Sequence, residues 1–274
     1  MKRRPVRRVV DVVLGLVFSA VLLFPLYWMV NVSLTKPLNL ARIPPSLIPI
    51  DPTLDGYRMA IARNLPAFTT SLAIALGTVA LTLLIALPAA YGVSKLKAPG
   101  TGVVMFAFLL AQMIPSVVLV MALFALYRQV GLYNTYFGLI LADSTASVPF
   151  AIILAQAFMR TIPDEIIEAA QIDGAGRMRT FLSIILPLSR NAVVTAALFS
   201  FLFAWGDFLN ARTLTAGKTF MPITLALYQF IGAEVTNWNG VMASAVLASI
   251  PAAVLIVFAQ RFVAAGITAG AVKD

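Results

Sequence analysis

Residues 160–190 read RTIPDEIIEAAQIDGAGRMRTFLSIILPLSR, and this polar stretch interrupts a chain that consists mostly of long apolar runs. One such run precedes it over 137–159, and another follows it over 191–211. A helix of roughly 20 apolar residues crosses about 30 Å of hydrocarbon. The stretch therefore predicts a loop outside the membrane that joins two spanning helices.

Four further apolar runs have this length, over 9–32, 66–93, 103–127 and 242–263. The 274 residues are 61% hydrophobic and 11% charged, whereas soluble domains usually carry about a quarter charged residues. We therefore predict an all-α fold, a polytopic membrane helix bundle with six transmembrane helices, as a single domain over 1–274. A basic start before 9–32 is also typical of a signal peptide, but the length of this run and its lack of a small-x-small exit favour a retained helix.

The basic residues gather at the ends of the apolar runs and give the chain a net charge of +9. This placement favours charges that orient helices over a nucleic-acid-binding surface. Six spans put both termini on one side, and if that side is cytoplasmic, 13 of the 20 Lys and Arg residues lie in inner segments. The positive-inside rule therefore predicts cytoplasmic termini and two long outer segments, 37–65 and 212–240.

The chain contains no Cys and no His. Disulfides, thiolate metal sites and a Cys nucleophile are thereby excluded. The usual general base and the commonest metal ligand are missing as well. We predict no metal site and no catalytic residue.

The polar stretch itself predicts a short helix followed by a sharp turn. Thr161 can cap this helix, Pro163 is tolerated in its first turn, and Asp164 favours the positive end of the helix dipole. Gly174 is a helix breaker that ends it, and a second helical stretch covers 177–187. Composition alone also allows an amphipathic helix that only lies on the membrane surface.

The same stretch resembles the EAA motif of ABC importer permeases, because Glu168-Ala-Ala-x-x-x-Gly174 is followed after nine residues by Ile184-x-Leu186-Pro187. The resemblance implies a type I ABC importer permease whose coupling helix docks in a groove of an ATPase subunit. Small residues let such a helix sit deep in a cleft, and a carboxylate can pair with a partner Arg or Lys. By this resemblance, ATPase coupling is assigned to Glu168, Ala169, Ala170, Asp173, Gly174, Ala175, Leu186 and Pro187.

Further resemblance covers most of the chain. The segment 95–100 looks like the family's loop after the second span, and 203–208 is similar to a fifth-span motif that usually has Asn where this chain has Gly206. Ile-Asp-Gly-Ala at 172–175 matches the sugar branch, and 266–273 looks like the tail of the shorter permease of the maltose-importer type. The resemblance implies import of a di- or oligosaccharide or an amino sugar across the bacterial cytoplasmic membrane.

The resemblance also implies the partners. These are a second homologous permease, which forms the other half of the translocation pathway in a heterodimer, two ATPase subunits, an extracytoplasmic solute-binding protein, the sugar and membrane lipid, with no nucleic acid. No cofactor is expected in this chain, because ATP and Mg²⁺ belong to the ATPase subunits. The triplet 217–219, Gly-Lys-Thr, imitates the end of a phosphate-binding loop, but Arg212 stands where the full pattern needs Gly, which excludes ATP binding here.

Polar and aromatic residues within the apolar runs are candidates for the sugar pathway. An ionisable group at membrane depth is costly and often lines a pathway, and a Trp ring can stack on a sugar. Each candidate also has a structural interpretation, because such groups cap or pair within bundles and Trp is common at the membrane interface. The candidates are Asp207, Trp205, Asp143, Asn210 and Gln112.

Alternative functions stay open at this point. An ion-gradient-driven secondary carrier would need paired or relayed acidic groups at mid-membrane, whereas Asp143 and Asp207 are interpreted as isolated. A membrane-embedded enzyme would need a cluster of titratable groups at one depth, which the sequence does not assemble. Among importers, a sugar phosphate such as glycerol-3-phosphate is the alternative substrate.

Overall fold

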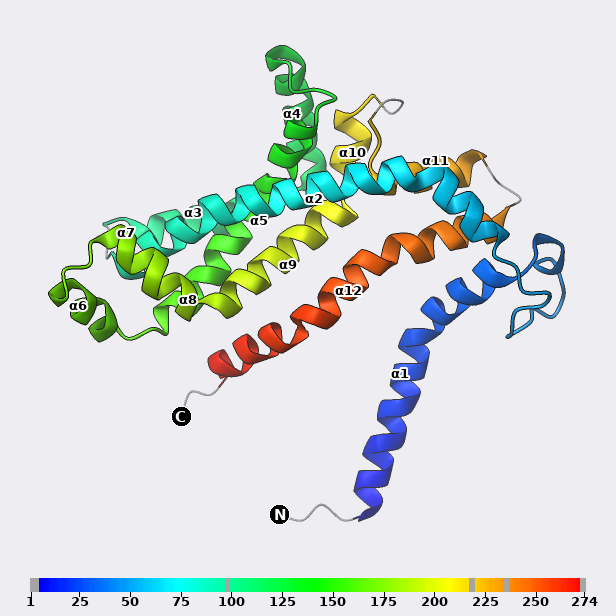
Figure 1. The fold of residues 1–274 in the computed structure, drawn as a ribbon, viewed down its shortest axis with the longest axis horizontal. Coiled ribbons are helices and arrows are strands. Elements are labelled where there is room, and N and C mark those ends of the chain that lie inside the picture. The colour runs from blue at the N-terminus through cyan, green and yellow to red at the C-terminus, as the bar shows by residue number, and fades with distance from the viewer. Residues whose placement is uncertain (1–4, 97–98, 217–219, 234–236, 272–274) are drawn as a thin grey trace. The chain divides into compact units, whose positions relative to one another are not determined.

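The computed structural model describes residues 5–96, 99–216, 220–233 and 237–271, and in these ranges the regular structure is helical (Figure 1). The prediction of an all-α membrane bundle is thereby confirmed. The α-helices are α1 Pro5–Leu34, α2 Asp55–Lys95, α3 Thr101–Gln112, α4 Ser116–Val130, α5 Tyr136–Arg160, α6 Asp164–Ile172, α7 Arg177–Thr180, α8 Leu186–Leu188, α9 Arg190–Gly206, α10 Leu209–Leu214, α11 Ile223–Ala233 and α12 Trp238–Ala271. A 3-10 turn covers Pro37–Asn39, and a π-helical turn covers Phe181–Ile185.

Four helices in the described part, α1, α2, α5 and α12, are each long and apolar enough to cross a membrane. Two bent pairs raise the number to six if each pair is one span. The first pair, α3 and α4, bends by 94°, and the second bends by 79° where the helical stretch 177–188 meets α9. The predicted span 103–127 is therefore broken, because Pro115 lacks an amide hydrogen and disfavours helix in the residue before it.

The predicted helix positions differ from those of the structure, most clearly for α2, α9 and α11. Helix α2 begins at Asp55 rather than at 66, because the proline-rich segment ends before Asp55 and Pro66 is accommodated inside the helix. Helix α9 ends at Gly206, so the end of the predicted span 191–211 lies in the separate helix α10. The segment 212–240, for which the sequence predicts an outer position, also contains the helix α11, whose apolar residues stand among turn signals.

The chain divides into two compact units, 1–65 with 227–250 and 66–226 with 251–274. A single permease domain over 1–274 stays a prediction. In the first unit, the Asn239 side-chain amide donates to the carbonyls of Ser33 and Thr35 at 2.7 and 2.9 Å, where α1 ends. A Cβ on Gly56 would lie 2.2 Å from Asn239 Oδ1, so only glycine permits this approach of α2 to α12.

In the second unit, α5 packs against α9, α3 packs against α5, and α10 packs against α4 (Figure 1). Small residues permit this close packing, as is common between helices in membranes, where backbones approach closely to gain dispersion contacts. Fully buried alanines of this unit in α2, α5 and α9 include Ala75, Ala86, Ala90, Ala151, Ala155, Ala192 and Ala196.

Candidate functional site

Helix α6 begins at Asp164, later than a cap at Thr161 would place it, because Thr161 does not cap this helix. Pro163 occupies the N-cap position, and no side chain accepts a capping hydrogen bond there. The Thr161 hydroxyl instead donates to the Phe158 carbonyl at 2.8 Å, at the end of α5. Thr161 lies two residues before the cap and therefore belongs to the preceding helix.

Gly174 ends α6 as predicted. Its φ of +80° lies in the left-handed region, its amide donates to the Gln171 carbonyl at 3.0 Å, and the Ala175 amide donates to the Ala170 carbonyl at 2.9 Å. These two bonds form a Schellman motif, which satisfies carbonyls that have no partner within the helix. The EAA sequence thus makes a helix that stops abruptly and turns toward α7.

Replacing Gly174 with Ala is expected to loosen this turn. A Cβ at this position meets no atom within 4 Å, so the cost arises from the positive φ alone and amounts to roughly 1–2 kcal/mol. Such a cost raises local opening about 5–30-fold. Tryptic cleavage after Arg177, measured in membranes with the cytoplasmic face accessible, should accelerate accordingly, whereas Gly174→Asn should change it less, because Asn tolerates this conformation. Equal cleavage of the Ala variant and the parent chain would contradict the prediction.

The residues of the motif divide between two faces of α6. Ala170 is buried, together with Ile167, against the rest of the second unit. Glu168, Ala169 and Asp173 are exposed. The exposed side also carries Ile172, whose side chain is 87% exposed and which was not predicted as a site residue. An exposed isoleucine between carboxylates gives this face the mixture of apolar and acidic groups that a docking surface needs.

The second half of the motif anchors the loop. Leu186 packs against the cluster that includes Met159, Ile167 and Ile185, whereas Pro187 is exposed. Ala175 is half-buried in the turn. Leu186 is therefore placed to hold the loop against α5, and Pro187 is placed near the bend that leads into α9.

Lys95, the last residue of α2, holds the start of α6. Its Nζ lies 2.8 Å from Asp164 Oδ1 and also donates to the Ile162 carbonyl. The Lys95 side chain is only 4% exposed. One turn earlier, the Tyr91 ring stacks on Phe181 with a centroid distance of 5.2 Å. The sequence indicated Lys95 as an orienting charge and as the start of the family-like segment 95–100, but not as a partner of Asp164, because a separation of 69 residues gives no local signal.

Three pathway candidates come together at the break between α9 and α10. The Asn210 side-chain amide donates to Asp143 Oδ1 at 2.8 Å. The Asp207 carboxylate accepts from the amides of Asn210 and Ala211 at 3.3 and 2.9 Å. The interpretation of Asp143 and Asp207 as isolated is therefore wrong: the break after Gly206 brings the two carboxylates to the same small hollow.

The geometry of this acid cluster (Asp143, Asp207 and Asn210) is closed. The hollow, which Ser71 and Leu139 also line, leaves no room for a water molecule. Asp207 holds the first turn of α10, and Asp143 is buried on α5. In the conformation described, the cluster joins helices and offers no space to a sugar.

The two remaining pathway candidates lie elsewhere. Trp205 is buried, and its ring stacks on Phe201 with an interplanar angle of 13° and a centroid distance of 5.4 Å. That face of the indole is therefore occupied by another ring. Gln112 is exposed at the end of α3 and is not among the residues that line the hollow of the acid cluster.

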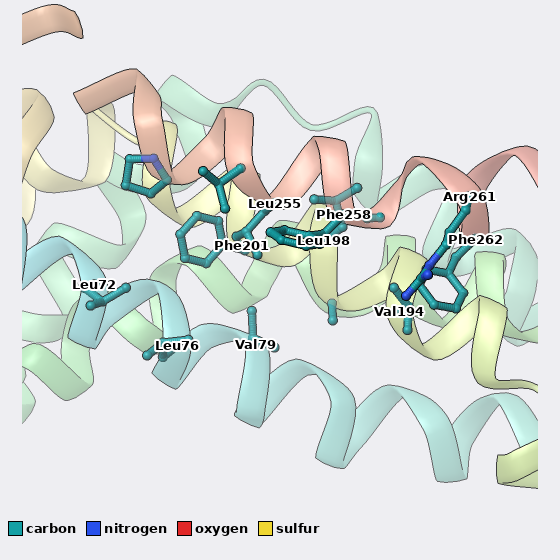
Figure 2. Close-up of a pocket in the computed structure, with 14 residues that line it drawn as sticks. Leu72, Leu76, Val79, Val194, Leu198, Phe201, Leu255, Phe258, Arg261 and Phe262 are labelled. Atoms are coloured by element: carbon teal, nitrogen blue, oxygen red, sulfur yellow. The ribbon is translucent and has the colours of Figure 1, made fainter. Parts of the chain in front are cut away.

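A larger cavity of about 560 Å³ lies between α2, α9 and α12 within the second unit (Figure 2). Its walls are aliphatic and aromatic side chains, among them Leu76, Phe201 and Phe258, with Arg261 as the charged exception. A sugar needs many hydrogen-bond partners, because burying an unpaired hydroxyl is costly. This apolar cavity is therefore unsuited to a sugar.

The phosphate-loop imitation at 217–219 lies outside the described residues. In the tail at 266–273, the structure describes the backbone as far as Ala271 and no side chain. Among the residues that the structure does describe, no three Asp or Glu side chains gather as metal ligands would.

Comparison with known proteins adds to this geometry. The profile of the family described as "Binding-protein-dependent transport system inner membrane component" matches residues 82–269. The chain is 37% identical to the trehalose transport system permease protein SugB of Mycobacterium tuberculosis, over 92% of each chain. It is 30% identical to the trehalose/maltose transport system permease protein MalG of Thermococcus litoralis, over 100% of this chain and 99% of the relative.

A solved structure has a similar fold. A chain of a bacterial ABC transporter involved in the import of the acidic polysaccharide alginate superposes with a TM-score of 0.80. The match covers 93% of this chain and 96% of that chain at 22% identity. At this identity the likeness concerns the fold alone.

Proposed function

The chain belongs to the family of binding-protein-dependent transport system inner membrane components, and from this we propose that it is a permease subunit of an ATP-driven sugar importer. The observation that carries the proposal is the match of 188 consecutive residues, 82–269, to that family, together with an EAA segment folded as a helix with an exposed face. The protein is a multi-pass membrane protein and a transport subunit. It carries out no covalent chemistry in this proposal.

The substrate that we propose is a di- or oligosaccharide. Support comes from the relatives, since SugB is named for trehalose and MalG for trehalose and maltose. The polar cluster of Asp143, Asp207 and Asn210 supplies hydrogen-bonding groups at membrane depth, and it would have to open before it could meet a sugar. An amino sugar and a sugar phosphate such as glycerol-3-phosphate are the alternatives that the transport test separates.

We assign ATPase docking to the exposed face of α6. Glu168, Ala169 and Asp173 lie on it with Ile172, so a carboxylate can pair with a basic residue of the ATPase while the small and apolar side chains enter its groove. ATP and Mg²⁺ are held by two ATPase subunits. ATP binding closes these subunits, moves the permeases and opens the pathway outward, and hydrolysis resets it.

The remaining partners follow from the same assignment. A second, related permease completes the pathway, a solute-binding protein delivers the sugar to the outer segments, and both termini of this chain lie in the cytoplasm. The bias of basic residues toward the segments on the side of α6 supports this orientation.

The secondary-carrier hypothesis gains one observation, the proximity of Asp143 and Asp207. Both carboxylates, however, accept hydrogen bonds that serve the fold, and a carrier has no need for an EAA segment. ATP dependence decides between the two hypotheses.

The complete complex is reconstituted in proteoliposomes. We expect sugar uptake only when ATP is present on the side of the membrane that carries the ATPase subunits and the solute-binding protein is present on the opposite side. Radiolabelled trehalose, maltose, N-acetylglucosamine disaccharide and glycerol-3-phosphate serve as probes, and the sugar that co-purifies with the solute-binding protein identifies the natural substrate. A non-hydrolysable ATP analogue is the control. Uptake without ATP, driven by a proton or sodium gradient, would overturn the importer assignment in favour of the carrier.

A further inference from the structure

We propose that Lys95 is a positioning residue that ties α6 to α2, so that a displacement of α6 moves a span to which it is not joined in sequence. This inference rests on the proposed function, because it assumes that an ATPase displaces α6. It adds a route of transmission and a residue that the EAA motif does not contain.

The contacts of Lys95 converge on the first turn of α6 and the segment before it. Its ammonium group bonds the Asp164 carboxylate at 2.8 Å and the Ile162 carbonyl. The Lys95 side chain is 4% exposed, whereas that of Asp164 is 46% exposed. A buried ammonium group is costly without partners, so Lys95 is restrained to this position, and a shift of Asp164 would take away its carboxylate partner.

A second contact joins α2 to the far end of the same loop. Leu87, Tyr91 and Lys95 are spaced four residues apart and so lie along one face of α2. Tyr91 stacks on Phe181, and Leu87 belongs to the same buried cluster as Phe181 and Ile185. One face of α2 therefore contacts both the entry to α6 and the exit of the loop.

The connectivity explains why these contacts matter. In sequence, α6 follows α5 and leads through α7, the π-helical turn and α8 to α9. Helix α2 ends 69 residues before Asp164, so side-chain contacts are its direct link to α6. Helix α6 is short, and its buried residue Ile167 packs in the same cluster as Tyr91 of α2. A shift of α6 therefore pulls Lys95 through its charge-assisted hydrogen bond to Asp164 and carries the end of α2 with it.

The absence of Cys from the chain permits a direct test. Gly92 lies on α2 near Lys95, and a Cβ there meets no atom within 4 Å, so Gly92→Cys is a tolerated thiol reporter. In the complete complex with Cys-free partners, maleimide labelling of this thiol is measured with and without ATP and vanadate. We expect an ATP-dependent change in labelling rate that falls about fivefold or more in Lys95→Met, in line with typical coupling between sites, and that persists in Lys95→Arg.

Controls separate transmission from folding and from docking. Arg261→Met removes a positive charge from α12, where the guanidinium lies over the Phe262 ring, and it should leave the labelling change intact. Lys95→Met should still recruit the ATPase subunits, because the exposed face of α6 is unaltered.

Each outcome decides one question. If the ATPase is recruited and Lys95→Met keeps the full labelling change, or if Gly92→Cys alone shows no change, the tie to α2 is refuted while the proposed function stands. If the parent complex recruits no ATPase at all, the proposed function fails instead. A loss of recruitment in Lys95→Met that Lys95→Arg does not rescue would assign Lys95 a structural role only and overturn the inference.

Discussion

Glu168→Lys is expected to abolish recruitment of the ATPase and, with it, ATP-driven uptake. Glu168 is exposed on the face of α6 that also carries Ala169 and Ile172. If Glu168 pairs with an Arg or Lys of the ATPase, the substituted Lys places two positive charges next to each other, and such a juxtaposition costs several kcal/mol. A cost of about 3 kcal/mol weakens binding more than 100-fold, so the variant complex should lose its ATPase subunits during purification.

The measurement is co-purification of the ATPase with the affinity-tagged permease, followed by uptake in proteoliposomes. Glu168→Gln should fall between the parent and Glu168→Lys, because it loses the charge and keeps the shape. Gln171→Lys is a matched control: it adds the same Lys to the same helix at a position nearer the buried side that holds Ile167 and Ala170. If Glu168→Lys retains both its ATPase and its uptake, the coupling assignment is wrong.

Much of the fold could be predicted from the sequence because hydropathy and helix signals are local. Long apolar runs indicated the helices α1, α2, α5 and α12. The end of α6 could also be predicted, because Gly174 is the residue that adopts a positive φ at low cost. What hydropathy could not show is a bend, since a run that breaks at Pro115 has the same composition as a straight helix.

The site was predicted less completely for a different physical reason. Asp143 and Asn210 are 67 residues apart and meet only because α9 stops at Gly206. Lys95 meets Asp164 only because α2 ends where α6 begins. Such contacts depend on tertiary packing, so a spacing rule along one helix does not reveal them. The EAA residues were recognisable because they lie at fixed spacings within one continuous stretch of the sequence, 168–187.

Asn210→Asp is expected to destabilise the second unit more than any truncation at this position. Asn210 donates to Asp143 Oδ1 at 2.8 Å, and its backbone amide faces the Asp207 carboxylate. The substitution removes the donor and places a third carboxylate beside two others in a hollow with no room for water. An uncompensated buried charge costs about 3–5 kcal/mol, whereas Asn210→Ala, which only leaves an acceptor unpaired, should cost about 1–3 kcal/mol.

Thermal unfolding of the purified complex and its uptake rate, measured side by side, separate the two interpretations of this cluster. If the cluster only joins α5 to α10, both substitutions lower the unfolding temperature in the stated order, and uptake falls only as folded complex is lost. If the cluster opens to the sugar during transport, Asn210→Ala lowers uptake per folded complex beyond its modest loss of stability, because a hydrogen-bonding group has left the pathway. An Asn210→Asp complex as stable as the parent would contradict the expected cost of placing a third carboxylate in this closed cluster.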